Sequence, residues 1–325
     1  MASVLITGGA GYIGSHVCKL LAAHGHLPIA FDNLSEGHRE LVRWGPLIVG
    51  DTRDFASLSE AIAKCRPDAI MHFAASAYVA DSMRDPLGYY DNNVVGMVTL
   101  LRAARRYDVS RVVFSSSCAT YGTANENPIS EDHPQAPINP YGASKLMCER
   151  MLADAEIAHG LKSVALRYFN VGGSDPEGET GEWHQPETHL IPLVLDAALG
   201  RRGHFTVLGD DYPTEDGTCV RDFIHVLDVA EAHRLALEWL LGDHESLRLN
   251  LGNGAGYSVR QVVDAAARVT KRRIPIQIEK RRAGDPPTLI GKATRARQVL
   301  GWIPRRPKIE EQIADAWGWH RTRFC

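Results

Sequence analysis

Short apolar stretches alternate with longer stretches of helical periodicity through the first half of the chain. The apolar stretches are rich in β-branched residues and predict strands at residues 3–7, 28–32, 47–49, 69–73, 111–115 and 163–169. The stretches between them predict helices at residues 12–24, 55–64, 87–107 and 141–159. Strands that alternate with helices favour βαβ units. The pattern therefore predicts an α/β fold, a doubly wound (Rossmann) parallel sheet with helices on both faces.

The pattern changes after Asn170. Residues 172–186 are rich in Gly, Pro, Glu and Asp and predict a long loop, which inside a compact protein is usually functional. Beyond it we expect a helix at 190–199, a strand at 205–208, a helix to residue 270 capped by Ser258, and a terminal helix at 309–319. We expect one domain at residues 1–170 and a smaller α/β domain at 171–325, with a segment near 218–250 that returns to the first.

Composition and charge exclude several classes of function. The chain has 325 residues, 36 Lys and Arg, 39 Asp and Glu and a net charge of −3, so no basic domain for nucleic acid is expected. No apolar window approaches the length of a membrane span, and the first apolar run is too short for a signal peptide. The six cysteines form no C-x-x-C pair. These features predict a cytoplasmic protein with reduced thiols and no membrane partner.

Three possible metal ligands lie close together in the second half. His184, Glu187 and His189 fall in the Pro- and Gly-rich region. Two histidines at i and i+4 on a helix are the spacing that metallohydrolases use, and this segment lacks it. The sequence therefore predicts no metal site.

A glycine motif follows the first predicted strand and opens the first helix. Its members are Gly8, Gly11 and Gly14. Glycine permits the tight turn and lets the backbone approach a pyrophosphate, while the helix N-terminus supplies N–H groups and a positive dipole end. A plain glycine turn is the alternative, but the strand before it and the helix after it favour a dinucleotide site.

Acidic and small residues at the ends of the next strands refine this site. Asp32 ends the second strand, where a carboxylate accepts hydrogen bonds from ribose hydroxyls and repels a 2′-phosphate, so NAD is favoured over NADP. Asp51 follows the third strand and could reach the adenine amino group. The run of residues 73–75 ends the fourth strand and would let the backbone approach phosphates. A loop-capping role for Asp32 and simple packing for the others are the alternatives.

Tyr141 and Lys145 stand at i and i+4 on a predicted helix and therefore share one face. An ammonium near a phenol favours the phenolate, so we expect a lowered Tyr141 pKa and a role as general base and acid. The preceding strand ends in Ser115-Ser116-Ser117, at the sheet edge where α/β proteins build their sites. Such serines also commonly bond their own backbone.

With these residues the chain resembles the extended short-chain dehydrogenase/reductases and, within them, the UDP-galactose (UDP-glucose) 4-epimerases. The stretch Asp-Tyr-Pro-Thr-Glu-Asp-Gly-Thr at 211–218 is highly specific to these epimerases. The matching segments are 7–14, 32–34, 72–75, 89–93, 115–122, 141–145, 166–170, 209–218, 220–222 and 281–285.

The resemblance implies an NAD-dependent interconversion of UDP-galactose and UDP-glucose by transient oxidation at C4, with NAD retained in the site. Residues 1–170 would bind NAD and residues 171–325 the UDP-sugar. Tyr141 and Lys145 would be catalytic with Ser117. The expected NAD-binding residues are Gly8, Gly11, Tyr12, Ile13, Gly14, Asp32, Asn33, Asp51, Thr52, Phe73, Ala74, Ala75, Asn92, Lys145 and Phe169. The expected substrate-binding residues are Ser117, Tyr141, Asn170, His189, Leu190, Thr206, Leu208, Arg221, Arg282 and Asp285. Members commonly form homodimers, here through the helices at 87–107 and 141–159.

The chain departs from the family's pattern at a few positions. Ala119 stands where some members have a threonine, Ala77 where some have a lysine that binds the cofactor, and Leu289 where a residue tunes tolerance for N-acetylated sugars. Dehydratases of the same fold carry Asp-Glu after the active-site hydroxyl, and Cys118 and Ala119 are found here instead. A 4-epimerase of UDP-N-acetylhexosamines or UDP-pentoses, and more remotely a non-catalytic NAD-sensing regulator, remain as alternatives.

Overall fold

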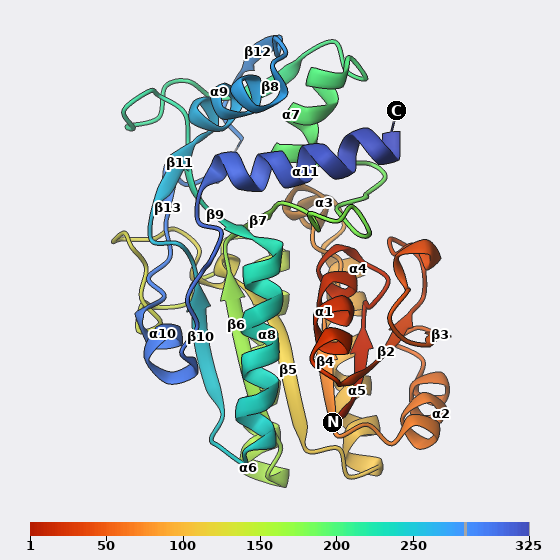
Figure 1. The fold of residues 1–325 in the computed structure, drawn as a ribbon. Helices are drawn as coiled ribbons and strands as arrows, with labels where there is room; N and C mark the ends of the chain where they lie inside the picture. The colour runs from red at the N-terminus through yellow and green to blue at the C-terminus, as the bar shows by residue number, and fades with distance from the viewer. Residues whose placement is uncertain (283–284, 325) are drawn as a thin grey trace.

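The computed structural model describes residues 1–282 and 285–324, and within them the largest element is a seven-stranded sheet (Figure 1). Its strands follow the order β10-β6-β5-β4-β1-β2-β3, and every neighbouring pair is parallel. Their bounds are β1 Ser3–Thr7, β2 Leu27–Asp32, β3 Leu47–Val49, β4 Ala69–His72, β5 Arg111–Ser117, β6 Lys162–Tyr168 and β10 Leu247–Leu251. The predicted doubly wound fold is confirmed. The strand order reverses between β1 and β4, and ligands of such sheets bind outside the carboxyl ends of the strands at this point.

Helices cover both faces of this sheet (Figure 1). The five principal ones are α1 Tyr12–Ala23, α2 Phe55–Cys65, α5 Gly96–Arg106, α6 Pro140–His159 and α8 Val226–Leu241. Val4 and Ile6 of β1 belong to the buried cluster under α1 and α8. Leu5, between them, belongs to the cluster under α2, α5 and α6. Alternate side chains of one strand thus enter opposite cores, which explains why the strands are apolar without interruption.

The prediction of one continuous helix at 87–107 is wrong. The chain forms α3 Val79–Arg84, α4 Pro86–Tyr89, one turn of π-helix at Tyr90–Val95, and then α5. Within the wide turn, Asn93 Nδ2 donates to Ser144 Oγ of α6 at 3.0 Å and to the Ser76 carbonyl at 3.0 Å. Such turns are frequent at functional sites. Apolar periodicity cannot reveal this turn, because its hydrogen bonds reach residues far away in the sequence.

The segment after residue 218 returns to the large sheet. β9 Val220–His225 leads into α8, which packs against α1, and β10 then pairs with β6 through Leu247 opposite Val164. This is the arrangement expected for residues near 218–250. The domain bounds themselves remain a prediction.

The smaller part of the molecule lies beyond the carboxyl ends of the strands (Figure 1). There α11 packs against α7 and α9, and β8 pairs in parallel with β12. Ser258 and Gln261 form the capping box that begins α9, as the sequence predicts for Ser258. The terminal helix extends to Phe324, beyond the predicted residue 319. The remaining bounds are β7 Asn170–Gly172, α7 Leu190–Leu199, β8 Phe205–Leu208, β11 Gly256–Ser258, α9 Val259–Thr270, β12 Ile276–Glu279, β13 Thr288–Leu289, α10 Thr294–Leu300 and α11 Ile309–Phe324, with 3-10 turns at Arg39–Leu41 and Cys118–Tyr121.

Among the described helices, none combines the length and the apolar character needed to cross a membrane. The five described cysteines are all free. Three residues of the sequence-based analysis, Ala283 and Gly284 of the segment 281–285 and Cys325 of the cysteine set, lie outside the described residues.

Candidate active site

The glycine motif forms a cradle at the carboxyl end of β1. Gly8 has a φ of +74°, and a Cβ there would lie 2.7 Å from the Ala74 backbone nitrogen. A Cβ on Gly14 would collide with the Gly8 carbonyl. Gly11 begins α1, and the first turn of this helix has neither a side-chain cap nor an acidic residue. Its N–H groups and positive dipole end are therefore available to an anion, and the cradle fits a dinucleotide pyrophosphate.

Asp32 is buried beside this cradle at the end of β2. Its carboxylate accepts hydrogen bonds from the Ala10 N–H at 3.0 Å and the Leu34 N–H at 2.9 Å. Burial raises the pKa of this carboxyl, and the two backbone hydrogen bonds oppose that shift. Each oxygen keeps a lone pair for a further donor, so the loop-capping role and a ribose contact are compatible.

Asp51 and Asn33 lie next to each other beyond β2 and β3. Asn33 Nδ2 donates to Asp51 Oδ2 at 3.0 Å, and Arg53 holds the same carboxylate through its Nε and a terminal nitrogen at 2.9 and 2.7 Å. Hydrogen bonds from Arg53 hold the pKa of Asp51 well below its usual range. The Asp51 carboxylate is therefore ionised and held in place by Arg53 and Asn33. Its contact with adenine remains a prediction.

The end of β4 borders the cradle on its other side. The backbone N–H groups of Phe73 and Ala74 both donate to the Thr7 carbonyl, at 2.9 and 3.1 Å. Asn92, in the π-turn, donates to Ser76 Oγ at 3.1 Å. The predicted NAD residues from β1, β2, β4 and the π-turn thus gather at one edge of the sheet. Other members of the set are Tyr12, Ile13, Thr52, Ala75 and Phe169, of which Tyr12, Thr52 and Phe169 are buried and Ile13 and Ala75 partly buried.

Ser117 and Tyr141 are brought together where β5 ends and α6 begins. Ser117 Oγ accepts a hydrogen bond from the Ala119 N–H at 3.1 Å, and Asn139 caps α6 by accepting from the Gly142 N–H at 2.8 Å. A Cβ on Gly142 would collide with the Ala119 carbonyl. The glycine after Tyr141 therefore permits the close approach of α6 to the turn after Ser117, a role that the Tyr141–Lys145 spacing alone does not predict.

Lys145 lies one helical turn after Tyr141 and is almost fully buried. Its Nζ donates to the Ser115 carbonyl at 2.8 Å and lies 5.8 Å from the centre of the Tyr141 ring. Burial lowers the pKa of Lys145 to about 8, because a desolvated ammonium is unfavourable. The strand therefore fixes the ammonium beneath the phenol.

The expected lowering of the Tyr141 pKa is wrong for the protein alone. Burial raises this pKa to about 12, although the Ser117 hydroxyl acts in the opposite direction. The Lys145 ammonium donates to a carbonyl of β5 and is not hydrogen-bonded to the phenol oxygen among the described contacts. Desolvation of the phenolate consequently outweighs the stabilising hydrogen bond with Ser117.

A buried polar network beneath the site was not predicted. Arg167 on β6 and Glu149 on α6 form an ion pair at 2.5 Å, and Ser116 also donates to Glu149. Arg167 donates to the Tyr121 hydroxyl at 2.8 Å, which donates in turn to Asn250. The network joins α6 to β5, β6 and β10. The only sequence signal for it is the position of Glu149, one turn after Lys145 on the same helix.

The predicted substrate residues come from several elements of the smaller part. Arg221 on β9 and Asp285 form an ion pair at 2.5 Å, while Arg282 is exposed. Thr206 and Leu208 lie on β8, paired with β12, and Leu190 begins α7. Asn170 on β7 pairs with Phe223 of β9. The structure brings Arg221 and Asp285 into contact, and the Asp285 N–H donates to the Arg282 carbonyl at 3.3 Å. The described contacts do not join the other members of the set to these three residues.

Asp222, the neighbour of Arg221, was also missed as an organising residue. Its fully buried carboxylate accepts hydrogen bonds from the N–H groups of Asn253, Gly254 and Gly291. Burial raises the pKa of Asp222 to about 6. Because a Cβ on Gly291 would collide with Phe169, this carboxylate holds the 291 backbone against one of the predicted NAD residues.

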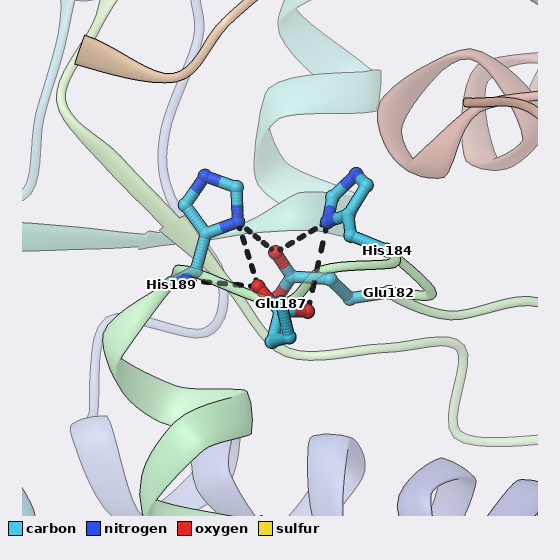
Figure 2. Close-up of side chains that lie close together, drawn as sticks. All are labelled: Glu182, His184, Glu187 and His189. Carbon is cyan, nitrogen blue, oxygen red and sulfur yellow. Dashed lines mark hydrogen bonds and ion pairs between the residues drawn. The ribbon is translucent and has the colours of Figure 1, made fainter. Parts of the chain in front are cut away.

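His189 lies in a cluster with Glu182, His184 and Glu187 (Figure 2). His189 is the N-cap residue immediately before α7, and the other three lie in the loop between β7 and α7. The rings of Tyr12 and Tyr78 contact the histidine rings at centroid distances of 5.8–6.5 Å. This loop therefore lies against the first turn of α1.

Comparisons with known proteins agree with this geometry. The chain matches the NAD dependent epimerase/dehydratase family over residues 4–252. It is 54% identical over 318 residues to the UDP-glucose 4-epimerase of Rhizobium leguminosarum bv. trifolii, covering 98% of this chain and 97% of that protein.

Two solved structures are similar over nearly the whole length. The UDP-glucose 4-epimerase from Brucella ovis in complex with NAD is 50% identical, with a TM-score of 0.96 over 98% of this chain and 99% of that one. The enzyme from Bifidobacterium longum in complex with NAD+ and UDP is 35% identical, with a TM-score of 0.95 over 99% and 98%. With its glycine cradle and its Ser117, Tyr141 and Lys145, the chain belongs to the NAD dependent epimerase/dehydratase family.

Proposed function

We propose that this protein is an NAD-dependent epimerase that interconverts UDP-galactose and UDP-glucose at C4 of the sugar. The single observation that carries the proposal is the grouping of Ser117, Tyr141 and Lys145 at the carboxyl end of β5, next to a glycine cradle that fits NAD. UDP-glucose 4-epimerases share 46–54% of their residues with this chain over nearly its full length.

NAD would be held by the cradle of Gly8, Gly11 and Gly14 and by Asp32. When bound, it would accept a hydride from C4 of the sugar and return it. Tyr141 accepts the proton of the sugar 4-hydroxyl, and Ser117 holds the same oxygen by a hydrogen bond. Lys145 favours the phenolate through its charge, which must offset the desolvation that raises the Tyr141 pKa. The same phenol returns the proton after the sugar has presented its other face.

The smaller part would bind the UDP group. Arg221 is mostly buried and already orients its guanidinium against Asp285, so it is suited to a phosphate once that pair opens. Arg282 is exposed and free to swing toward a second phosphate, leaving Asp285 to accept from a ribose hydroxyl. Asn170, His189, Leu190, Thr206 and Leu208 complete the proposed substrate set.

A homodimer is proposed through α5 and α6. Large apolar side chains are exposed to solvent on both segments: Leu87 on α4, Val95 in the π-turn, Val98 on α5, and Met147 and Ile157 on α6. Helix faces of this kind suit a four-helix contact. Measurement of the molar mass in solution tests this, and a monomer at micromolar concentration contradicts it. We also propose a cytoplasmic location, in keeping with the free state of the five described cysteines.

The experiment that tests the activity uses purified protein and UDP-galactose without added NAD. Formation of UDP-glucose is expected, because the cofactor is regenerated in each turnover and stays bound. UDP-N-acetylgalactosamine and a UDP-pentose run in parallel distinguish the alternative sugars. Absence of conversion of all three, with and without added NAD, would contradict the proposal and favour a regulator that binds NAD without catalysis.

A further inference from the structure

Two groups of acidic and imidazole side chains occur in the loop between β7 and α7, and they differ in the cation that neutralises them. Asp175, Glu177 and Glu179 surround the ammonium of Lys19, whose Nζ lies 2.8 Å from Asp175 and 2.7 Å from Glu179. The second group is Glu182, His184, Glu187 and His189, called here the His–Glu cluster (Figure 2). Among the described residues, no lysine or arginine forms an ion pair with Glu182 or Glu187.

Burial makes neutralisation of this cluster necessary. The side chains of Glu182 and Glu187 are only 7% and 12% exposed. Two buried carboxylates without a cation would cost several kcal/mol each, so they need a paired charge. The charge can come from protons on both imidazoles or from one divalent ion bound to neutral imidazoles.

The arrangement of the atoms favours an ion at the centre. His189 Nδ1 lies 2.8 Å from Glu182 Oε1 and 3.2 Å from Glu187 Oε1. His184 Nδ1 lies 3.5 Å from Glu182 Oε1 and 3.6 Å from Glu187 Oε2. Zinc bonds of about 2.0–2.1 Å in a tetrahedron separate neighbouring ligand atoms by about 3.3 Å. The observed separations scatter around this value, and both rings point their Nδ1 atoms at the same space (Figure 2).

The hydrogen bonding provides a second, independent observation. Both Nδ1 atoms are buried, and neither makes a hydrogen bond of ordinary geometry despite the nearby carboxylates. His189 occupies the N-cap position of α7, but its side chain forms no capping hydrogen bond. Glu187 Oε1 already accepts hydrogen bonds from the backbone N–H groups of Thr188 and His189, at 2.7 and 2.8 Å, which orient this carboxylate. Buried polar atoms of native proteins are normally partnered, and a central cation would partner both imidazole nitrogens at once.

We propose that the His–Glu cluster binds one divalent transition-metal ion of the zinc class through His184 Nδ1, His189 Nδ1 and a carboxylate oxygen of each glutamate. Four protein ligands on eight consecutive residues make a closed, structural site. Two carboxylates and two neutral imidazoles leave the loaded site without net charge. The ion fastens the loop to the start of α7 beside Tyr12 and is separate from the reacting groups Ser117 and Tyr141.

The test uses the untagged full-length protein, treated with a chelator and then freed of it. One equivalent of zinc chloride is added, unbound metal is removed by gel filtration, and metal per chain is measured by mass spectrometry. About one zinc per chain is expected, with a rise in Tm of at least about 2 °C. Magnesium and calcium, which prefer all-oxygen sites, should leave Tm unchanged.

Glu182→Gln and His184→Gln should each reduce bound zinc to less than about a tenth of the wild-type content and remove the Tm shift. Glu177→Gln, in the group that Lys19 neutralises, is the matched control and should bind zinc like the wild type. Far-ultraviolet circular dichroism verifies folding, and the second variant decides if the first does not fold. Absence of bound zinc in the wild type, or equal zinc in the wild type and both cluster variants, would overturn the proposal.

Discussion

The two parts of the molecule hold the side chains of the proposed active site differently. In the sheet part, Asp32, Ser117 and Lys145 are buried, and each is held by a backbone N–H or carbonyl. In the smaller part, Arg221 and Asp285 instead neutralise each other. Groups fixed by the backbone keep their place during a reaction, whereas an ion pair between side chains can open for a ligand. The difference indicates that chemistry belongs to the sheet part and recognition of the charged substrate to the smaller part.

Removal of the Tyr141 phenol oxygen tests most severely whether the chemical step belongs to the sheet part. Tyr141→Phe should reduce kcat by about 10²- to 10⁴-fold, because proton transfer loses its general base. The affinity for UDP, measured by calorimetry, should remain close to that of the wild type. Tyr107→Phe, at the end of α5, is the matched control and should keep its turnover. A kcat of the Tyr141 variant within threefold of the wild type would disprove the role of this residue.

Obstructing the glycine cradle should have the next largest effect. Gly14→Ala places a methyl group against the Gly8 carbonyl, so the turn that receives the pyrophosphate must shift. We expect NAD affinity to fall by roughly 10- to 100-fold, equivalent to the loss of one or two good hydrogen bonds to a charged group. Gly318→Ala, in α11 with no atom near its Cβ position, is the control. Unchanged NAD retention in the Gly14 variant would place the cofactor elsewhere.

The smaller part is tested by removing its guanidinium. Arg221→Ala should raise KM for the UDP-sugar by about tenfold, because a charge-assisted hydrogen bond to phosphate is lost, and should change kcat much less. Arg297→Ala on α10 serves as an exposed control. A loss confined to kcat would contradict the division between the two parts, since it would give Arg221 a role in the chemical step.

The pH dependence of turnover should show the smallest effect. Burial lowers the pKa of Lys145 to about 8, so its ammonium is present below that pH and is lost as the pH rises through it. We therefore expect kcat to fall by several-fold between pH 8 and 9. Lys145→Arg, whose cation persists above pH 12, should weaken this alkaline decline while lowering activity through poorer fit. A profile that is flat to pH 10 would show that the Lys145 charge is not required.

Local patterns were sufficient to predict the core of the sheet part. Its buried strands are continuous apolar runs, and Gly8, Gly11 and Gly14 stand between a strand and a helix, so both fold and cradle follow from neighbouring residues. The π-turn could not be predicted in this way, because Asn93 bonds Ser76 and Ser144 across the fold. The Glu149–Arg167 pair likewise joins a helix to a strand that pattern analysis treats separately.

The pKa of Tyr141 and the grouping of residues from distant or irregular segments could not be predicted from the sequence pattern. The spacing of Tyr141 and Lys145 predicted a lowered phenol pKa, but spacing carries no information on burial, which raises it. Helical spacing predicts no metal site from His184, Glu187 and His189, and it does not include Glu182. The turning of one loop brings these four together. The predicted substrate residues come from β7, α7, β8 and β9. A local sequence pattern cannot predict how side chains from four separate elements are arranged around UDP.

The proposed transfer of a hydride to NAD and back can be followed through the hydrogen at C4 of the sugar. UDP-galactose carrying deuterium at C4 is incubated with the protein in ordinary water, and the UDP-glucose formed is analysed by mass spectrometry and NMR. The UDP-glucose formed should keep its deuterium at C4, because the hydride is removed and returned within one closed site. Conversion with replacement of deuterium by solvent hydrogen, or no conversion at all, would contradict the proposed transfer.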